Sequence, residues 1–192
     1  MGASDVADLL IQSGARVDAR DSQGRTAPQE ASFSGYADVV RPSLAVGADP
    51  NAADKKGQTA LMLAAGTLYL IEGCPLLVTK ADSIDEALRA LLEAHPNPNA
   101  ADQQGRTALM FAAKYGRTTA SKELILAKSD LNMKDNEGRT ALYLGLDSEV
   151  VEITELLRYA GASGATASRE TSPTKHAGPE SPPSLRGSCP GL

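Results

Sequence analysis

Four copies of one pattern, Asp-x-x-Gly-x-Thr-Ala, constrain this chain more than any other feature. The copies begin at Asp21, Asp54, Asp102 and Asp135, so their spacings are 33, 48 and 33 residues. The middle spacing is one period plus an insertion of 15 residues. A period of this length is typical of architectures in which each unit buries its apolar face against its neighbours. The chain is therefore predicted to form a stack of similar units.

Within each copy, the sequence predicts a tight turn followed by two helices. The Asp side chain can bond to nearby backbone, and the Gly tolerates a positive φ. The Thr can cap a helix, and good helix formers follow it in Ala60 to Ala65 and Ala108 to Ala113. Gly35 breaks the chain after the first helix, and a second helix with apolar residues at helical spacing follows. Each unit therefore reads as turn, helix, turn, helix.

This order of elements resembles the ankyrin repeat, whose family pattern reads roughly Asp-x-x-Gly-x-Thr-Pro-Leu-His-x-Ala-Ala, then an aliphatic helix and Gly-Ala-Asp-x-Asn. The resemblance implies an all-α fold, an ankyrin-repeat solenoid of paired antiparallel helices with β-turn fingers. It predicts an ankyrin-repeat domain over residues 1–162 and a tail over residues 163–192. The predicted repeats span about residues 5–20 (partial), 21–53, 54–101, 102–134 and 135–162. The opening half repeat is either a degenerate cap or part of a longer array.

The predicted repeats depart from the family pattern at positions that affect stability. The family histidine is replaced in all four copies, by Gln29, Met62, Met110 and Tyr143. Because that histidine links neighbouring turns by hydrogen bonds, apolar packing must partly replace it. Pro42 falls inside a predicted second helix, where it removes a hydrogen bond and costs ~3 kcal/mol. His95 and Lys128 stand where the pattern has a stop glycine, so each is expected in the left-handed region at a cost of roughly 1 kcal/mol.

Two segments do not follow the repeat pattern. The insertion over residues 67–81 is apolar and needs cover, either by packing on its own solenoid, which we favour, or by docking to another chain. Ser83 and Glu86 form a capping-box pattern that predicts a helix start at Ile84. The tail over 163–192 is rich in Ser, Pro and Gly and is predicted to be disordered.

The inventory of reactive residues favours no catalytic centre. His95 and His176 are the only histidines, and neither has a second ligand at metal-binding spacing. The chain contains no phosphate-binding loop, nucleophile elbow or dinucleotide fingerprint. It is therefore predicted to be a non-enzyme with no catalytic residues, no cofactor and no metal site. A small enzyme with a site beside Cys74 is the alternative from another class.

Composition narrows the partners and the compartment. The formal net charge of -5 disfavours nucleic acid as a partner. The strongest apolar stretch, Leu68 to Val78, is interrupted by Glu72 and Pro75 and is shorter than the roughly 20 apolar residues of a membrane-spanning helix. The start of the chain shows no secretory signal pattern. We expect a monomer without a membrane span, in the cytoplasm, with the nucleus as the alternative.

A solenoid recognises partners on its extended concave surface, so function is expected on the finger tips and first helices. The candidate partner-binding residues are Arg25, Phe33, Lys55, Lys56, Gln58, Gln103, Gln104, Arg106, Lys114, Tyr115, Asn136 and Arg139. Basic residues are expected along this edge and acidic residues on the second helices. The surface is predicted to bind an acidic or polar protein segment, with Phe33 and Tyr115 as anchors. The alternative is a regulatory or inhibitory subunit that contacts an enzyme through the insertion over 67–81.

Overall fold

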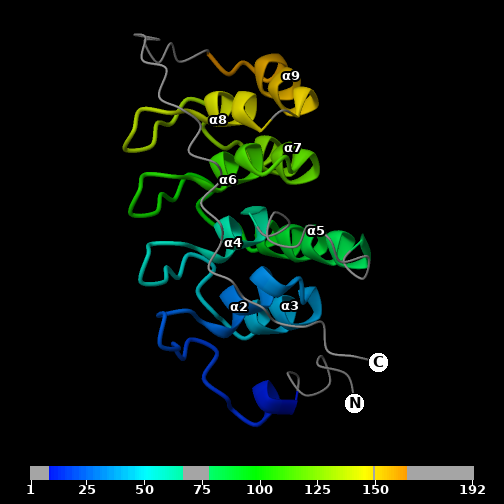
Figure 1. Ribbon diagram of the computed structural model, residues 1–192. Coiled ribbons are helices and arrows are strands. Elements are labelled where there is room, and N and C mark those ends of the chain that lie inside the picture. Colours follow the sequence, from blue (N-terminus) through cyan, green and yellow to red (C-terminus); the bar gives the residue numbers. More distant parts are fainter. Residues whose placement is uncertain (1–8, 67–77, 149, 164–192) are drawn as a thin grey trace, which may run out of the picture.

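The protein is described by a computed structural model that covers residues 9–66, 78–148 and 150–163. Residues 9–12 are helical, and four helix pairs follow. The pairs are α2 (Ala27–Ser34) with α3 (Ala37–Ala45), α4 (Ala60–Gly66) with α5 (Val78–Glu93), α6 (Ala108–Lys114) with α7 (Thr118–Leu126), and α8 (Ala141–Asp147) with α9 (Val151–Tyr159). The pairs stack in chain order, and the turns between them project from one side (Figure 1). The predicted all-α solenoid is confirmed.

One apolar core runs along the whole stack. The first helices pack in the order α2, α4, α6 and α8, and the second helices pack in the order α3, α5, α7 and α9. Small residues such as Ala64 and Ala112 are fully buried, which lets neighbouring helices approach closely. Leu88 and Leu124 of the second helices are also fully buried. Each unit is therefore covered by its neighbours, as the repeat spacing predicts.

The predicted helix starts and stops are largely confirmed. The side-chain oxygen of Thr107 accepts a hydrogen bond from the backbone N–H of Met110, and Thr140 does the same for Tyr143. His95 and Lys128 have φ values of 50° and 62°, so both adopt the expected left-handed conformation. These residues end the second helices where the other repeats use glycine.

The position of the family histidine is filled differently in different repeats, and in the last one Tyr143 is 40% exposed. Met62 and Met110 are 1% exposed, so apolar packing replaces the histidine there, as expected. Gln29 is also 1% exposed, but its side-chain amide donates to the backbone oxygens of Ala52 at 3.0 Å and Gln58 at 2.7 Å. The first repeat therefore keeps a hydrogen-bonded link to the next turn. The sequence alone does not indicate this link, because the acceptors of Gln29 lie 23 and 29 residues later in the chain.

Two local predictions concern the second helices. Pro42 lies inside α3, as predicted, and the helix continues past it to Ala45. The predicted helix start at Ile84 is wrong, because α5 begins at Val78 and Ser83 lies within it. A Ser-x-x-Glu pattern does not mark the start of a helix when good helix formers such as Lys80 and Ala81 precede it, because the helix can begin earlier. The rest of the predicted insertion and the tail from residue 164 lie outside the described residues.

Candidate functional site

Each finger is closed by the aspartate that opens the repeated pattern. In the third finger, one carboxylate oxygen of Asp102 accepts from the backbone N–H groups of Gln104 at 2.9 Å and Arg106 at 2.8 Å. Gly105 supplies the positive φ of 75° that completes the turn. The same two bonds occur in the other three fingers, where Asp21, Asp54 and Asp135 are the acceptors. The shared pattern therefore fixes the backbone of the finger and leaves its tip side chains free to differ.

Neighbouring fingers are joined by backbone hydrogen bonds, which we call the finger ladder. At each junction, the residue after the aspartate donates its N–H to the second residue after the preceding aspartate. The bonds run from Lys55 to Gln23 at 3.0 Å, from Gln103 to Lys56 at 3.0 Å and from Asn136 to Gln104 at 2.9 Å. The side-chain amide of Gln103 also donates to the Lys55 carbonyl at 2.9 Å. The four tips therefore form one continuous ledge.

Two of the predicted binding arginines stabilise their own fingers. Arg106 pairs with Asp102 at 2.7 Å, and Arg139 pairs with Asp135 at 2.8 Å. Both aspartate side chains are at most 1% exposed. The Arg106 guanidinium also lies 4.6 Å from the ring centre of Phe111. The charges of these arginines are thus largely compensated inside the protein.

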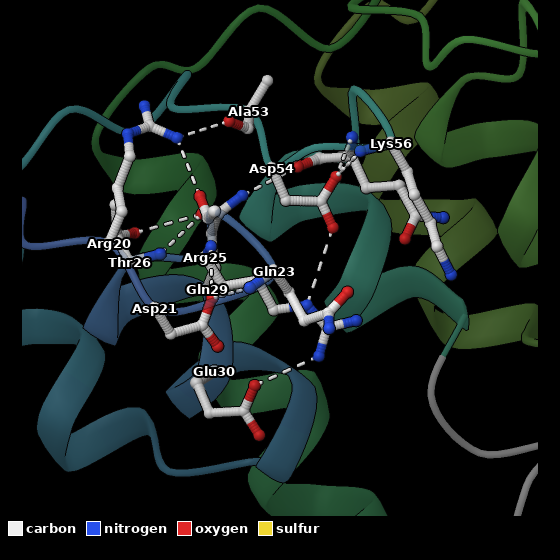
Figure 2. A network of polar contacts seen from close by, with 12 residues as sticks. Arg20, Asp21, Gln23, Arg25, Thr26, Gln29, Glu30, Ala53, Asp54 and Lys56 are labelled. Atoms are coloured by element: carbon white, nitrogen blue, oxygen red, sulfur yellow. Dashed lines mark hydrogen bonds and ion pairs between the residues drawn. The ribbon is translucent and has the colours of Figure 1, made fainter.

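The junction of the first two fingers uses a different arrangement, shown in Figure 2. The second finger has Gln58 where the later fingers have arginine. Its Asp54 is instead approached by Arg25 of the preceding finger at 3.6 Å, and Arg25 also pairs with Glu30 at 3.1 Å. Arg20 crosses the same junction and donates to the carbonyls of Gly24 at 2.8 Å and Ala53 at 2.6 Å. Sequence reasoning missed Arg20, because it lies outside the repeated pattern.

The remaining candidate residues are available at the surface to different degrees. Exposed side chains are those of Lys55, Lys56, Gln103, Gln104, Lys114 and Asn136, and intermediate ones are those of Phe33, Gln58 and Tyr115. Two cations lie near aromatic rings, Arg25 at 5.4 Å from Phe33 and Lys114 at 5.5 Å from Tyr115. Within residues 9–66, 78–148 and 150–163, Lys55, Lys56 and Lys114 form no ion pair. Lys55 and Lys56 therefore carry uncompensated positive charge at the second finger tip, and Lys114 carries it at the end of α6.

The second helices carry less uncompensated negative charge than expected. Their acids pair with bases on the preceding repeat: Arg41 with Glu93 at 2.5 Å, Arg89 with Glu123 at 2.9 Å and Lys122 with Glu152 at 3.0 Å. The hydrogen bond that Arg89 donates to the Glu123 carboxylate raises the pKa of Arg89 above its ordinary value. The expected charge asymmetry is therefore reduced by a row of inter-repeat ion pairs on these helices.

Neither a metal centre nor a membrane span is found in the parts of the chain that the structure describes. Within them, no three His, Cys, Asp or Glu side chains gather in a way that could hold a metal ion. No helix there combines the length and the apolar character needed to cross a membrane.

The model of the family described as ankyrin repeats (3 copies) matches residues 76–167. The chain is an ankyrin repeat protein.

Membership in this family gives the stack a general role. Ankyrin repeats are generally protein–protein interaction modules, and the fold is a non-catalytic interaction fold. The matched residues include α5 to α9. The preceding part of this ankyrin repeat protein has the same finger geometry and the same helix pairing, with α2 packed on α3 and α4.

Acid should weaken the last finger of this ankyrin repeat protein. Burial by itself raises the pKa of Asp135, but hydrogen bonds from the Arg139 backbone and guanidinium and from the Glu137 backbone outweigh it. The pKa of Asp135 therefore lies below its ordinary value of 3.8. A carboxylate with a lowered folded-state pKa stabilises the fold above its unfolded-state pKa, and this stabilisation disappears as the pH falls through the folded-state pKa.

The Asp135→Asn variant should therefore be less stable than the wild type at neutral pH, and this difference should shrink in acid. Urea unfolding at about pH 7 and about pH 3 would measure the difference. Glu137→Gln is the control, because the Glu137 side chain is 69% exposed. A stability difference between Asp135→Asn and wild type that does not change with pH would contradict the assignment.

Proposed function

We propose that this protein is a non-catalytic scaffold or adaptor that binds a protein partner along the ledge and the adjoining first helices. The observation that carries the proposal is the uncompensated charge of Lys55 and Lys56 at the second finger tip. These lysines lie beside Gln103 and Gln104 of the next tip, whose side chains can hydrogen-bond to a polar chain. The chemistry fits an extended segment that carries carboxylates.

Aromatic side chains near the other end of the first helices support the same proposal. Phe33 and Tyr115 are partly exposed, and each lies near a cation. Such rings can supply apolar anchoring area, while the lysines contribute attraction and orientation. Arg106 and Arg139 have a different role in the proposal, because they hold the ledge in shape and contribute little free charge. Cytoplasmic localisation remains a prediction.

The test is a charge reversal at the second finger tip. The Lys55→Glu/Lys56→Glu variant should recover partners at least about tenfold less well than the wild type in a pull-down read by quantitative mass spectrometry. Arg106 is left unchanged, because its reversal would also break the pair with Asp102. Lys128→Glu is the matched control. Lys128 is an exposed lysine as well, but it follows the second helix α7 and is not part of a finger tip.

Equal recovery of partners by the double variant and the wild type would refute the proposal, provided that circular dichroism shows both to be folded. Loss of recovery with Lys128→Glu would also contradict it, because it would indicate a general charge effect. The alternative contact through the insertion over 67–81 concerns residues whose side chains lie outside the described part of the chain.

A further inference from the structure

The last repeat exposes apolar side chains at positions that the inner repeats bury. Tyr143 lies three residues after the capping Thr140 and is 40% exposed, whereas Met110, three residues after Thr107, is 1% exposed. Leu146 is 55% exposed, whereas Ala113 at the same position of α6 is 0% exposed. The inner positions are covered because the next first helix packs against them. We call the surface around Tyr143 and Leu146 the trailing face.

The finger ladder also stops at the trailing face. A Cβ atom added to Gly105 would lie 3.0 Å from the backbone nitrogen of Asn136 in the next finger. Gly138 has the same φ of 75°, but no atom lies within 4 Å of its added Cβ. The trailing face therefore has the same kind of surface by which the inner repeats pack on one another, and no described residue covers it.

The corresponding surface at the start of the first full repeat is polar and does not match the trailing face. At the position of Leu63, Phe111 and Leu144, which are 3–8% exposed, the first full repeat has Glu30. The Glu30 side chain is 55% exposed and pairs with Arg25. Packing Leu146 against this ion pair would desolvate the charges without compensation.

The segment that follows the trailing face offers little apolar surface to cover it. Leu185 and Leu192 are the only large aliphatic residues between residues 164 and 192, which contain no aromatic residue. A second copy of the chain, in contrast, brings an identical apolar face. An interface between two identical faces is closed by a two-fold axis and leaves no open end.

Charges on α9 also fit a two-fold contact. Arg41, Arg89 and Lys122 occupy one register of the second helices, and each pairs with an acid on the following repeat. In α9 the same register holds Glu155, and Arg158 lies three residues further along the same helix. Both are exposed, and neither forms an ion pair within the described ranges. In a two-fold interface the same patch of both copies faces itself, so a residue i of one copy meets residue j of the other, and j meets i. Such a patch therefore needs both signs of charge to form ion pairs across the interface.

We propose that two copies of the chain dimerise through their trailing faces, with Tyr143 and Leu146 at the centre and Glu155 of each copy near Arg158 of the other. The dimer replaces the monomer expected from sequence, and it leaves the ledge free on both copies. It is independent of the proposed partner binding, because the finger tips take no part in it. The two ledges of such a dimer would bind a partner with two copies of a motif more tightly than a monomer would.

Sedimentation velocity of the full-length chain over about 1 to about 300 µM tests the dimer. The wild type should shift from monomer to dimer across this range, and Leu146→Glu should weaken dimerisation at least about 100-fold. Leu126→Glu is the matched control, because Leu126 is 77% exposed on α7, away from the trailing face. It should dimerise like the wild type.

A charge swap keeps the test independent of any folding defect. Glu155→Arg and Arg158→Glu should each weaken the dimer, and the double variant should restore it. Amide hydrogen exchange at α8 should slow as the wild-type concentration rises. The proposal is overturned if the wild type stays monomeric throughout, if Leu126→Glu dissociates the dimer equally, or if protection of α8 is independent of concentration, which would indicate cover by residues 164–192.

Discussion

Replacing Arg117 with Met is expected to destabilise the protein by about 3 kcal/mol, the cost of breaking a buried ion pair. Arg117 is 5% exposed and precedes α7, where its guanidinium donates to the Asp85 carboxylate on α5 and, at 3.4 Å, to the Ala64 carbonyl at the end of α4. Without Arg117, the Asp85 charge loses its partner in a largely buried site. Urea unfolding followed by circular dichroism measures the effect.

The control for Arg117 is another inter-repeat pair at the surface. Arg89→Met removes the partner of Glu123, but the Arg89 side chain is 50% exposed, so the loss should stay below about 1 kcal/mol. Adding Asp85→Leu to Arg117→Met should recover part of the stability, because no unpaired charge remains. If Arg117→Met and Arg89→Met were equally mild, the buried pair would not hold the second and third repeats together.

Replacing Gly57 with Ala is expected to cost about 3 kcal/mol, because two effects add. Gly57 has a φ of 78°, which is unfavourable for any residue with a Cβ atom. The added Cβ would also lie 3.0 Å from the backbone nitrogen of Gln103 and 3.2 Å from the Asp102 Cα, so the two fingers would have to separate. Thermal and urea unfolding would measure the loss.

Gly138→Ala separates the two effects of the glycine substitution. Gly138 has a φ of 75° but an open surrounding, so its replacement should cost only about 1 kcal/mol for the left-handed backbone. The difference between the two variants then reports the close approach of neighbouring fingers. Equal costs at Gly57 and Gly138 would contradict the tight packing of the ledge.

Much of the fold follows from the sequence because the signals are local and repeated. The Asp-x-x-Gly-x-Thr-Ala pattern places the turn, the glycine with positive φ and the helix cap within seven residues. The left-handed positions of His95 and Lys128 followed from their register in the same pattern. The start of α5 did not, because the only start signal there, Ser83 with Glu86, lies inside a longer helix.

The candidate site was less predictable, because its electrostatics depend on contacts between repeats. The pattern places Arg25, Arg106 and Arg139 at one position, but it does not show that the latter two pair with the aspartates of their own fingers. In the second finger Gln58 stands in place of this arginine, and Arg25 of the preceding finger approaches Asp54 instead. Arg117 gave no signal at all, since its partner Asp85 lies 32 residues earlier.

The finger ladder has a consequence for how recognition can change in this chain. Its bonds use only main-chain atoms of the two residues that follow each aspartate, and those residues are Ser-Gln, Lys-Lys, Gln-Gln and Asn-Glu in the four fingers. The spacing of the tips is therefore kept by atoms that every residue except proline supplies. Charge and shape at these eight positions are free to vary, while the distance between successive tips stays the same.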